Sequence, residues 1–141
     1  MPAPRTILAF DFGLRRIGVA VGQDVTGSAS PLGTVNNRDD GVDYAAIASL
    51  IEEWRPSGIV VGMPSHADGS PSAMQEPIEA FILELQRYGL GVDTVDERHT
   101  SVEAEQALKK ARSRGSRGRI SKGMIDSAAA VFIAERYLSS G

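Results

Sequence analysis

The sequence predicts one α/β domain, in which a sheet of five strands carries helices on its faces. The length of 141 residues and a hydrophobic content of 42% suit a single domain with a real core. Short β-branched runs alternate with segments whose apolar residues recur at helical spacing. The expected order of elements is β-β-β-α-β-α-β-α-α, with a polar loop before the last helix and no internal repeat.

The first strands are expected to form a hairpin. Residues 6–10 and 17–21 are short apolar runs, and Gly13 between them permits a tight reversal of the chain. A third, short strand is expected over residues 32–37.

The middle of the chain predicts two helices around one buried strand. The first helix opens at Asp43 and ends before Pro56, because its apolar residues follow helical spacing between these two signals. A continuous apolar run over residues 58–64 is typical of a fully buried strand. The second helix covers residues 74–89, with Gly89 as its stop.

The C-terminal part predicts one more strand and two more helices. After a strand over residues 91–97, Thr100 and Glu103 form a capping box that opens a third helix. Residues 112–123 are rich in Gly, Ser and Arg, which predicts a mobile basic loop. The last helix, over residues 124–138, is apolar on nearly every side, so we expect it inside the fold.

Composition excludes several kinds of site. The chain has no cysteine, so disulfides, thiolate zinc sites and cysteine nucleophiles are ruled out. No segment approaches the roughly 18 apolar residues that a membrane-spanning helix needs. We therefore expect a soluble, cytoplasmic protein without a membrane partner.

The charge is unevenly distributed. The net charge of −3 argues against a general nucleic-acid binder, but residues 109–122 hold seven of the 15 Lys and Arg residues and no acid. The rest of the chain is strongly acidic in comparison. The sequence therefore predicts one basic patch on an acidic body.

Three acidic residues interrupt apolar surroundings. Asp11 ends the first predicted strand, Glu97 ends the last one, and Asp126 lies near the start of the last helix. Ligands of α/β sheets bind beyond the carboxyl ends of the strands, where Asp11 and Glu97 fall. Three adjacent carboxylates would repel one another unless a cation such as Mg²⁺ neutralised them. The alternative is that each acid is solvated or capping, and Asp126 could simply favour the helix dipole.

Four stretches of the chain together resemble one known family. They are DFGLRRIGVAVGQ, VVGMPSHADGS, VDERHTSVEAE and ISKGMIDSAAAVFIAERYL. In order and spacing they are similar to the blocks of the bacterial YqgF (RuvX-like) family, whose members are described as pre-16S rRNA nucleases and, formerly, as Holliday junction resolvases. The resemblance spans nearly the whole chain and implies an RNase H-like fold with a mixed five-stranded sheet.

The resemblance also implies the catalytic residues and the cofactor. Asp11, Glu97 and Asp126 match the catalytic metal ligands of the family, and the resemblance implies that they hold two Mg²⁺ or Mn²⁺ ions. Such a pair of ions activates a water molecule and stabilises the leaving oxygen of a phosphodiester. The implied activity is metal-dependent hydrolysis of structured RNA, with the 5′ end of the pre-16S ribosomal RNA as the expected substrate.

Two arginines of the matching blocks are expected to contact nucleic acid. Arg16 belongs to the first block, and Arg98 belongs to the DER stretch. We interpret Arg98 as a phosphate clamp, because a guanidinium binds phosphate oxygens bidentately. A salt bridge to an acid such as Asp96 is the alternative role.

Two histidines depart from the pattern of the family. His66 stands where an asparagine is usual, and His99 stands where leucine is more frequent. A metal-activated water needs no imidazole base, so we expect neither histidine to be catalytic. Asp68 and Gly69 are expected to shape a turn.

The basic segment before the last helix is a candidate nucleic-acid contact. RNA phosphates held there would lie beside a metal site that includes Asp126. A charge run is more often plain solvated surface, and the segment has no aromatic residues for base stacking. Its expected contact residues are Arg112, Arg114, Arg117, Arg119 and Lys122.

Two further functions stay open at this point. A junction resolvase that cuts branched DNA would need a dimer with two spaced sites. A non-catalytic RNA-binding or transcription-antitermination factor could retain the fold without cleaving. The expected partner is thus nucleic acid, either a ribosomal RNA precursor, with or without the ribosomal particle, or branched DNA, bound by a monomer or a homodimer.

Overall fold

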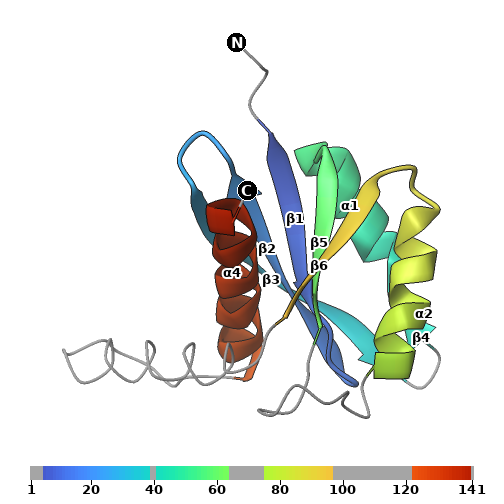
Figure 1. Ribbon diagram of the computed structural model, residues 1–141. Coiled ribbons are helices and arrows are strands. Elements are labelled where there is room, and N and C mark those ends of the chain that lie inside the picture. The colour runs from blue at the N-terminus through green and yellow to red at the C-terminus, as the bar shows by residue number, and fades with distance from the viewer. Residues whose placement is uncertain (1–4, 39–40, 64–74, 97–121, 141) are drawn as a thin grey trace, which may run out of the picture.

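The computed structural model describes residues 5–38, 41–63, 75–96 and 122–140, which form one mixed sheet with helices on both faces (Figure 1). The strand order is β4-β3-β2-β1-β5-β6. The strands are β1 (Thr6–Asp11), β2 (Arg16–Gln23), β3 (Ser28–Arg38), β4 (Gly41–Val42), β5 (Gly58–Met63) and β6 (Gly91–Asp96). The described helices are α1 (Tyr44–Trp54), α2 (Gln75–Gln86) and α4 (Lys122–Ser140).

The sheet joins an antiparallel half to a parallel half. The N-terminal hairpin is confirmed, since β1 pairs antiparallel with β2, and β2 with β3. On the other side, β1 runs parallel to β5, and β5 runs parallel to β6. Helix α2 connects β5 to β6, as a parallel pair requires. The predicted α/β class and mixed sheet are therefore confirmed.

The number of strands was predicted wrongly, because the sheet has six strands rather than five. The extra strand, β4, has only two residues and pairs with Asn37 and Arg38 at the end of β3. A two-residue strand is too short to show any periodicity. The third strand was also expected to be short, but β3 has 11 residues and includes Pro31. The first half of β3, which contains Pro31, pairs only with β2 among the described strands, so it is an edge of the sheet. An edge strand tolerates proline, because one side of it forms no ladder hydrogen bonds.

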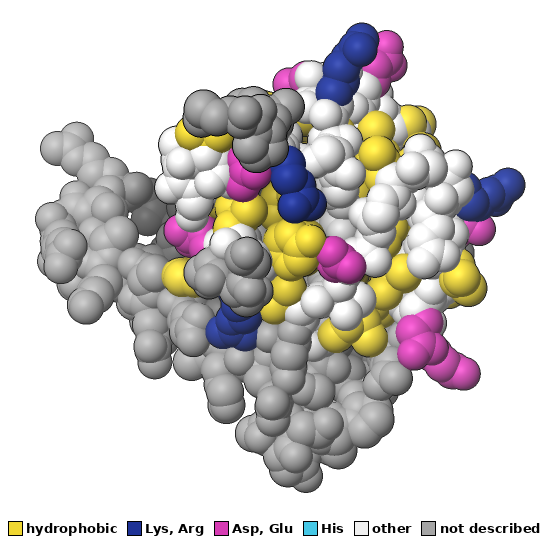
Figure 2. Space-filling view, turned by 45° about the horizontal axis from the view of Figure 1, so that its top comes forward, with side chains coloured by type: hydrophobic (Ala, Val, Ile, Leu, Met, Phe, Trp, Pro, Cys, Tyr) yellow, Lys and Arg dark blue, Asp and Glu magenta, His cyan; other side chains and the backbone are white. Residues whose placement is uncertain are grey.

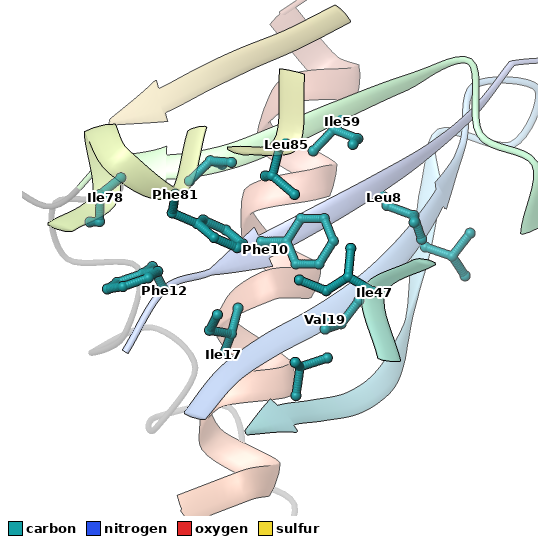
Figure 3. Close-up of a cluster of buried hydrophobic side chains, with 13 residues drawn as sticks. Leu8, Phe10, Phe12, Ile17, Val19, Ile47, Ile59, Ile78, Phe81 and Leu85 are labelled. Atoms are coloured by element: carbon teal, nitrogen blue, oxygen red, sulfur yellow. The ribbon is translucent and has the colours of Figure 1, made fainter. Parts of the chain in front are cut away.

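One face of the sheet is covered by α1 and α2 and holds the larger core (Figure 3). Every second residue of β1 points here, so Leu8 and Phe10 are fully buried. Phe81 of α2 meets the ring of Phe10 edge to face at 5.7 Å and the ring of Phe12 at 5.2 Å. Ile47 of α1 completes the contact between the two helices and the sheet. This aromatic core fixes the end of β1.

The opposite face of the sheet is covered by α4 (Figure 1). Ile7 and Ala9, the alternate residues of β1, pack with Ile133 and Ala134 of the helix. A Cβ added at Gly22 would lie 3.1 Å from Leu138, so the glycine lets α4 approach the sheet closely. Small residues therefore line both sides of this contact between α4 and the sheet.

The last helix is longer and less enclosed than predicted. It runs from Lys122 to Ser140 rather than over residues 124–138, so its first two residues fall in the segment predicted as a basic loop. Its buried residues lie on one side, whereas Phe132 is half-buried and Glu135 is exposed. The helix therefore packs on a face of the sheet as an amphipathic element.

The predicted limits of α1 agree with the structure, whereas α2 ends at Gln86, before its predicted stop at Gly89. Asp43 caps α1 by accepting a hydrogen bond of 3.2 Å from the backbone N–H of Ala46. Arg55 adopts a left-handed conformation directly after the helix, with φ 45°. Gly89 has φ 78° after α2, a conformation that glycine adopts readily. The predicted third helix, with Thr100 and Glu103, lies outside the described residues.

Candidate active site

The carboxyl ends of three parallel strands meet at one edge of the sheet. The pairings of β5 with β1 and with β6 place Phe10, Val61 and Thr94 side by side. Residues just beyond this level on each strand therefore lie at a common edge. Asp11 is the last residue of β1 and Asp96 the last of β6. The predicted position of the first carboxylate, at the end of a strand, is confirmed for Asp11.

Asp11 lies on the face of the sheet that α4 covers. It follows Ile7 and Ala9 in the alternation of β1, and both of these residues pack against that helix. Asp11 is paired with Gly18 of β2, is half-buried and interacts with neighbouring groups. Asp11 therefore lies at the end of β1 on the face that α4 covers.

Helix α4 begins at the same edge and runs antiparallel to β1 (Figure 1). Near its start, the buried hydroxyl of Ser127 donates to the carbonyl oxygen of Val19 and accepts from the N–H of Gly33, each at 3.3 Å. Val19 is paired with Phe10, one residue before Asp11. Asp126 precedes Ser127 directly, so the fold brings the backbone of Asp126 to the level of Asp11.

The turn from β1 to β2 carries Arg16 at the same edge. Arg16 is the first residue of β2, is half-buried and is paired with Asn36 of β3. Its side chain also interacts with neighbouring groups. Asn37 of β3 donates a side-chain hydrogen bond of 2.6 Å to the carbonyl oxygen of Gly13, which lies in this turn. Asp11 and Arg16 are thus the predicted site residues that the structure brings together on adjacent strands.

The other predicted site residues cannot be placed by their side chains. Asp126 and Lys122 belong to α4, of which only the backbone is described at these positions. The remaining predicted site residues lie outside the described residues, and so do the two histidines, Asp68 and Gly69. They are the predicted metal ligand Glu97 and the predicted nucleic-acid contacts Arg98, Arg112, Arg114, Arg117 and Arg119.

The metal site stays a prediction. Within residues 5–38, 41–63, 75–96 and 122–140, no group of three or more His, Cys, Asp or Glu side chains could hold a metal ion. Asp11 is the one member of the predicted set whose side chain the structure describes. The same part of the chain contains no helix that is long and apolar enough to cross a membrane.

The opposite end of the molecule, where β1 begins and α4 ends, carries a polar contact between α4 and the sheet. Figure 2 shows a face turned toward this end, on which the described basic side chains stand apart from one another. Near the end of α4, the hydroxyl of Tyr137 donates a hydrogen bond of 2.6 Å to Asp93 of β6. This bond, together with burial, raises the pKa of the Tyr137 phenol. This contact fixes the far end of α4 on the sheet.

Two residues that shape the site were missed by sequence reasoning. Ser127 is a buried polar residue in an apolar run, and that contrast was a usable signal. Asn37 is 9% exposed and lies in a stretch of polar residues, where nothing in the sequence distinguishes it from Asn36. Both bind backbone groups that come from other elements, so their roles depend on the tertiary fold.

Comparison with known families identifies the chain. The sequence model of the RuvX family, described as "Holliday junction resolvase", matches residues 5–140. This chain belongs to the RuvX family. A relative from Burkholderia cenocepacia, named "Putative pre-16S rRNA nuclease", is 45% identical over 134 residues, which cover 94% of this chain and 88% of the relative. A relative of the same name from Burkholderia lata is 46% identical over the same shares.

Solved structures show that this RuvX-family chain has the RNase H-like fold of RuvC-type resolvases. RuvC of Thermus thermophilus in complex with a Holliday junction matches with a TM-score of 0.61 at 14% identity, covering 96% of this chain and 94% of RuvC. The fowlpox virus resolvase with its junction DNA matches with a TM-score of 0.53 at 11% identity, covering 96% and 97%. Identities this low establish the fold alone.

Proposed function

We propose that this chain is a metal-dependent nuclease that hydrolyses phosphodiester bonds of structured RNA. The observation that carries the proposal is its 45% identity, over 94% of the chain, to relatives named as pre-16S rRNA nucleases. The position of Asp11 supports it, because a half-buried carboxylate at the meeting edge of three parallel strands is where α/β sheets bind ligands.

The residues proposed for this edge would suit a divalent cation. Asp11 supplies a carboxylate, the start of α4 carries Asp126, and Glu97 follows the last residue of β6 in the sequence. Oxygen ligands of this kind suit Mg²⁺ or Mn²⁺. Along β6, Val92 packs toward α1 and α2, and Val95 packs toward α4. Continued alternation would put the residue after Asp96 on the α4 face, as the proposal requires of Glu97.

The proposal gives the protein groups distinct tasks. Bound metal would supply a water of lowered pKa and charge stabilisation of the leaving oxygen. Asp11, Glu97 and Asp126 would hold the metal, and Arg98 would bind and orient the reacting phosphate bidentately. Arg16 and the basic segment would hold the flanking phosphates, with Arg112, Arg114, Arg117, Arg119 and Lys122 as contact residues.

For the substrate, we favour the 5′ end of the pre-16S ribosomal RNA during ribosome biogenesis in the cytoplasm. The printed names of the relatives support this choice. The fold itself is neutral between RNA and DNA, since an RNase H-like domain can host several nuclease activities. A requirement for the ribosomal particle, or for a homodimer, is part of what an experiment must decide.

A second candidate function is resolution of branched DNA. It is favoured by the description of the matching family and by the likeness to RuvC bound to a Holliday junction. A resolvase would cut two strands symmetrically and therefore would act as a dimer with two sites.

One experiment separates these functions. Purified protein is incubated with precursor ribosomal RNA and with a four-way DNA junction, each with and without Mg²⁺, beside the Asp11→Asn variant. Cleavage of RNA at the precursor 5′ end, only with Mg²⁺ and only by the wild type, supports the proposal. Cleavage of the junction alone favours the second candidate. Binding of RNA without cleavage by either protein, free or within ribosomal particles, would leave a non-catalytic RNA-binding role.

A further inference from the structure

The turn that links β1 to β2 is held by one residue of a third strand. Asn37 of β3 donates from its side-chain amide to the carbonyl oxygen of Gly13 at 2.6 Å. Its backbone N–H also donates to the carbonyl oxygen of Arg15 at 2.9 Å. A single residue therefore binds two carbonyl groups of the turn, on either side of Leu14.

Two further contacts restrict the same turn. A Cβ added at Gly13 would lie 2.5 Å from the carbonyl oxygen of Arg16, so the backbone folds back too tightly for any side chain there. Phe12 is buried, and its ring contacts Phe81 in the core. The turn is thus fixed at its start by a ring and at its middle by Asn37.

The amide of Asn37 is buried, so it needs a hydrogen-bond partner. The residue is 9% exposed, and a buried amide without a partner costs roughly 1–3 kcal/mol. The described partner of this amide is the Gly13 carbonyl at the edge of the molecule. The interaction therefore orders a surface turn, whereas a core packing role would need only an apolar side chain.

The ordered turn presents Arg15 to solvent four residues after Asp11 in the chain. Arg15 is exposed, and Leu14 beside it is 66% exposed. Among the described residues, no acid pairs with the Arg15 guanidinium. A guanidinium on an ordered turn loses less conformational freedom when it binds a phosphate than one on a flexible loop does.

We propose that residues 12–15 form a preorganised phosphate-binding turn, in which Arg15 contacts a backbone phosphate of the nucleic acid beside the Asp11 site and Asn37 is the positioning residue. The ligand class rests on the proposed function, whereas cleavage is not needed for the binding itself.

The first test measures nucleic-acid affinity without metal, so that no cleavage occurs. Fluorescence anisotropy with a labelled structured RNA and with a labelled four-way junction compares Arg15→Ser with the wild type. We expect affinity to fall about three- to tenfold, and the slope of log affinity against log salt to flatten by roughly 0.7–0.9, as for one phosphate contact. Arg87→Ser removes an exposed arginine directly after α2 that pairs with Glu84 and serves as the control, with affinity unchanged.

The second test asks whether Asn37 acts through Arg15. In a double-mutant cycle, Arg15→Ser is introduced into the wild type and into Asn37→Ala. We expect Asn37→Ala to weaken binding by about two- to fivefold, and Arg15→Ser in that background to add less than about twofold. Asn36→Ala changes the exposed neighbour on the same strand and should leave the Arg15→Ser effect at its full size. Asn37→Asp keeps the shape of the side chain without the donor and replaces the alanine variant if that one does not fold.

The outcomes separate this proposal from the proposed function. An unchanged salt slope in Arg15→Ser, or additive effects of Asn37→Ala and Arg15→Ser, overturns the phosphate-binding turn even if the wild type cleaves RNA. The expected slope and coupling support the turn even if neither substrate is cleaved, in which case the nuclease proposal fails alone.

Discussion

Ser127 of α4 donates a hydrogen bond of 3.3 Å to the carbonyl oxygen of Val19, a residue 108 positions earlier in the chain. The same hydroxyl accepts from the N–H of Gly33, which is the partner of Val19 in the pairing of β2 with β3. The register of that pairing shifts between Val19 and Ala20. The hydroxyl therefore bridges a carbonyl and an N–H at an irregular point of the sheet, and it ties the start of α4 to the level of Asp11.

We expect Ser127→Ala to lower the free energy of unfolding by about 1–3 kcal/mol, because it leaves buried backbone groups without their partner. Urea denaturation measures the change. Ser49→Ala alters an exposed serine of α1 and controls for the higher helix propensity of alanine, which by itself raises stability slightly. Equal stability of Ser127→Ala and wild type would show that the bridge is not needed to hold α4.

The elements that sequence predicted correctly are those with local signals. Helix α1 was bounded by its cap, Asp43, and by Pro56, and β5 by an unbroken apolar run, so each could be identified from its own residues. The strand β4 and the first half of β3 lack such signals. They are strands only because β2 and β3 offer them hydrogen-bonding partners. Tertiary context decided these elements, as it often does for strands.

The site was predictable to the same extent. Asp11 interrupts an apolar run, so its placement at the carboxyl end of a strand followed from the sequence alone. Ser127 and Asn37 shape this edge through backbone groups of Val19, Gly33 and Gly13, which lie far from them in the chain. Such contacts leave no periodic pattern, because a buried polar residue is recognisable only once its neighbours are known.

Tyr137 gives the stability of the protein a dependence on alkaline pH. Its hydrogen bond to Asp93, and then burial, raise the pKa of the phenol above the ordinary value of about 10. A group whose pKa is raised by folding stabilises the folded state below its unfolded pKa and loses this contribution as pH rises through its folded pKa. We therefore expect stability to fall above about pH 10 more steeply in the wild type than in Tyr137→Phe.

Thermal melts between pH 8 and pH 11 measure this difference. Because Asp93 is exposed, we expect Tyr137→Phe to lower stability near neutral pH by less than about 1 kcal/mol. The pKa values of Tyr44 and Tyr88 are raised too, mainly by burial, and these residues titrate in both proteins. Parallel pH profiles of the two proteins would argue that the Tyr137–Asp93 bond is not formed in solution.

The basic segment is expected to act on substrate affinity and not on the fold. Exchanging Arg112, Arg114, Arg117 and Arg119 for Ser should flatten the salt dependence of RNA affinity by roughly three to four units, at about 0.7–0.9 per phosphate. Turnover at saturating RNA should fall much less than affinity, because the metal ligands and Arg98 would handle the reacting phosphate. A salt dependence equal to that of the wild type would mean that the segment does not touch nucleic acid.

Removal of the carboxylate of Asp11 tests the centre of the proposed site. We expect Asp11→Asn, Glu97→Gln and Asp126→Asn each to abolish cleavage, with a loss beyond the roughly 10–100-fold of changes that only support a ligand. The fold should stay intact, and stability without metal should be unchanged or higher, because one charge leaves a cluster of like charges.

Metal binding gives Asp11→Asn a readout that does not depend on activity. A cation that binds only the folded protein stabilises it, by about 1.4 kcal/mol at ten times its Kd. Thermal melts with increasing Mn²⁺ should therefore raise the Tm of the wild type and leave that of Asp11→Asn nearly constant. Glu52→Gln removes an exposed carboxylate of α1 and should respond to Mn²⁺ like the wild type. An Asp11→Asn protein that still cleaves within about tenfold of the wild-type rate would remove Asp11 from the catalytic set, since loss of even a supporting group costs that much.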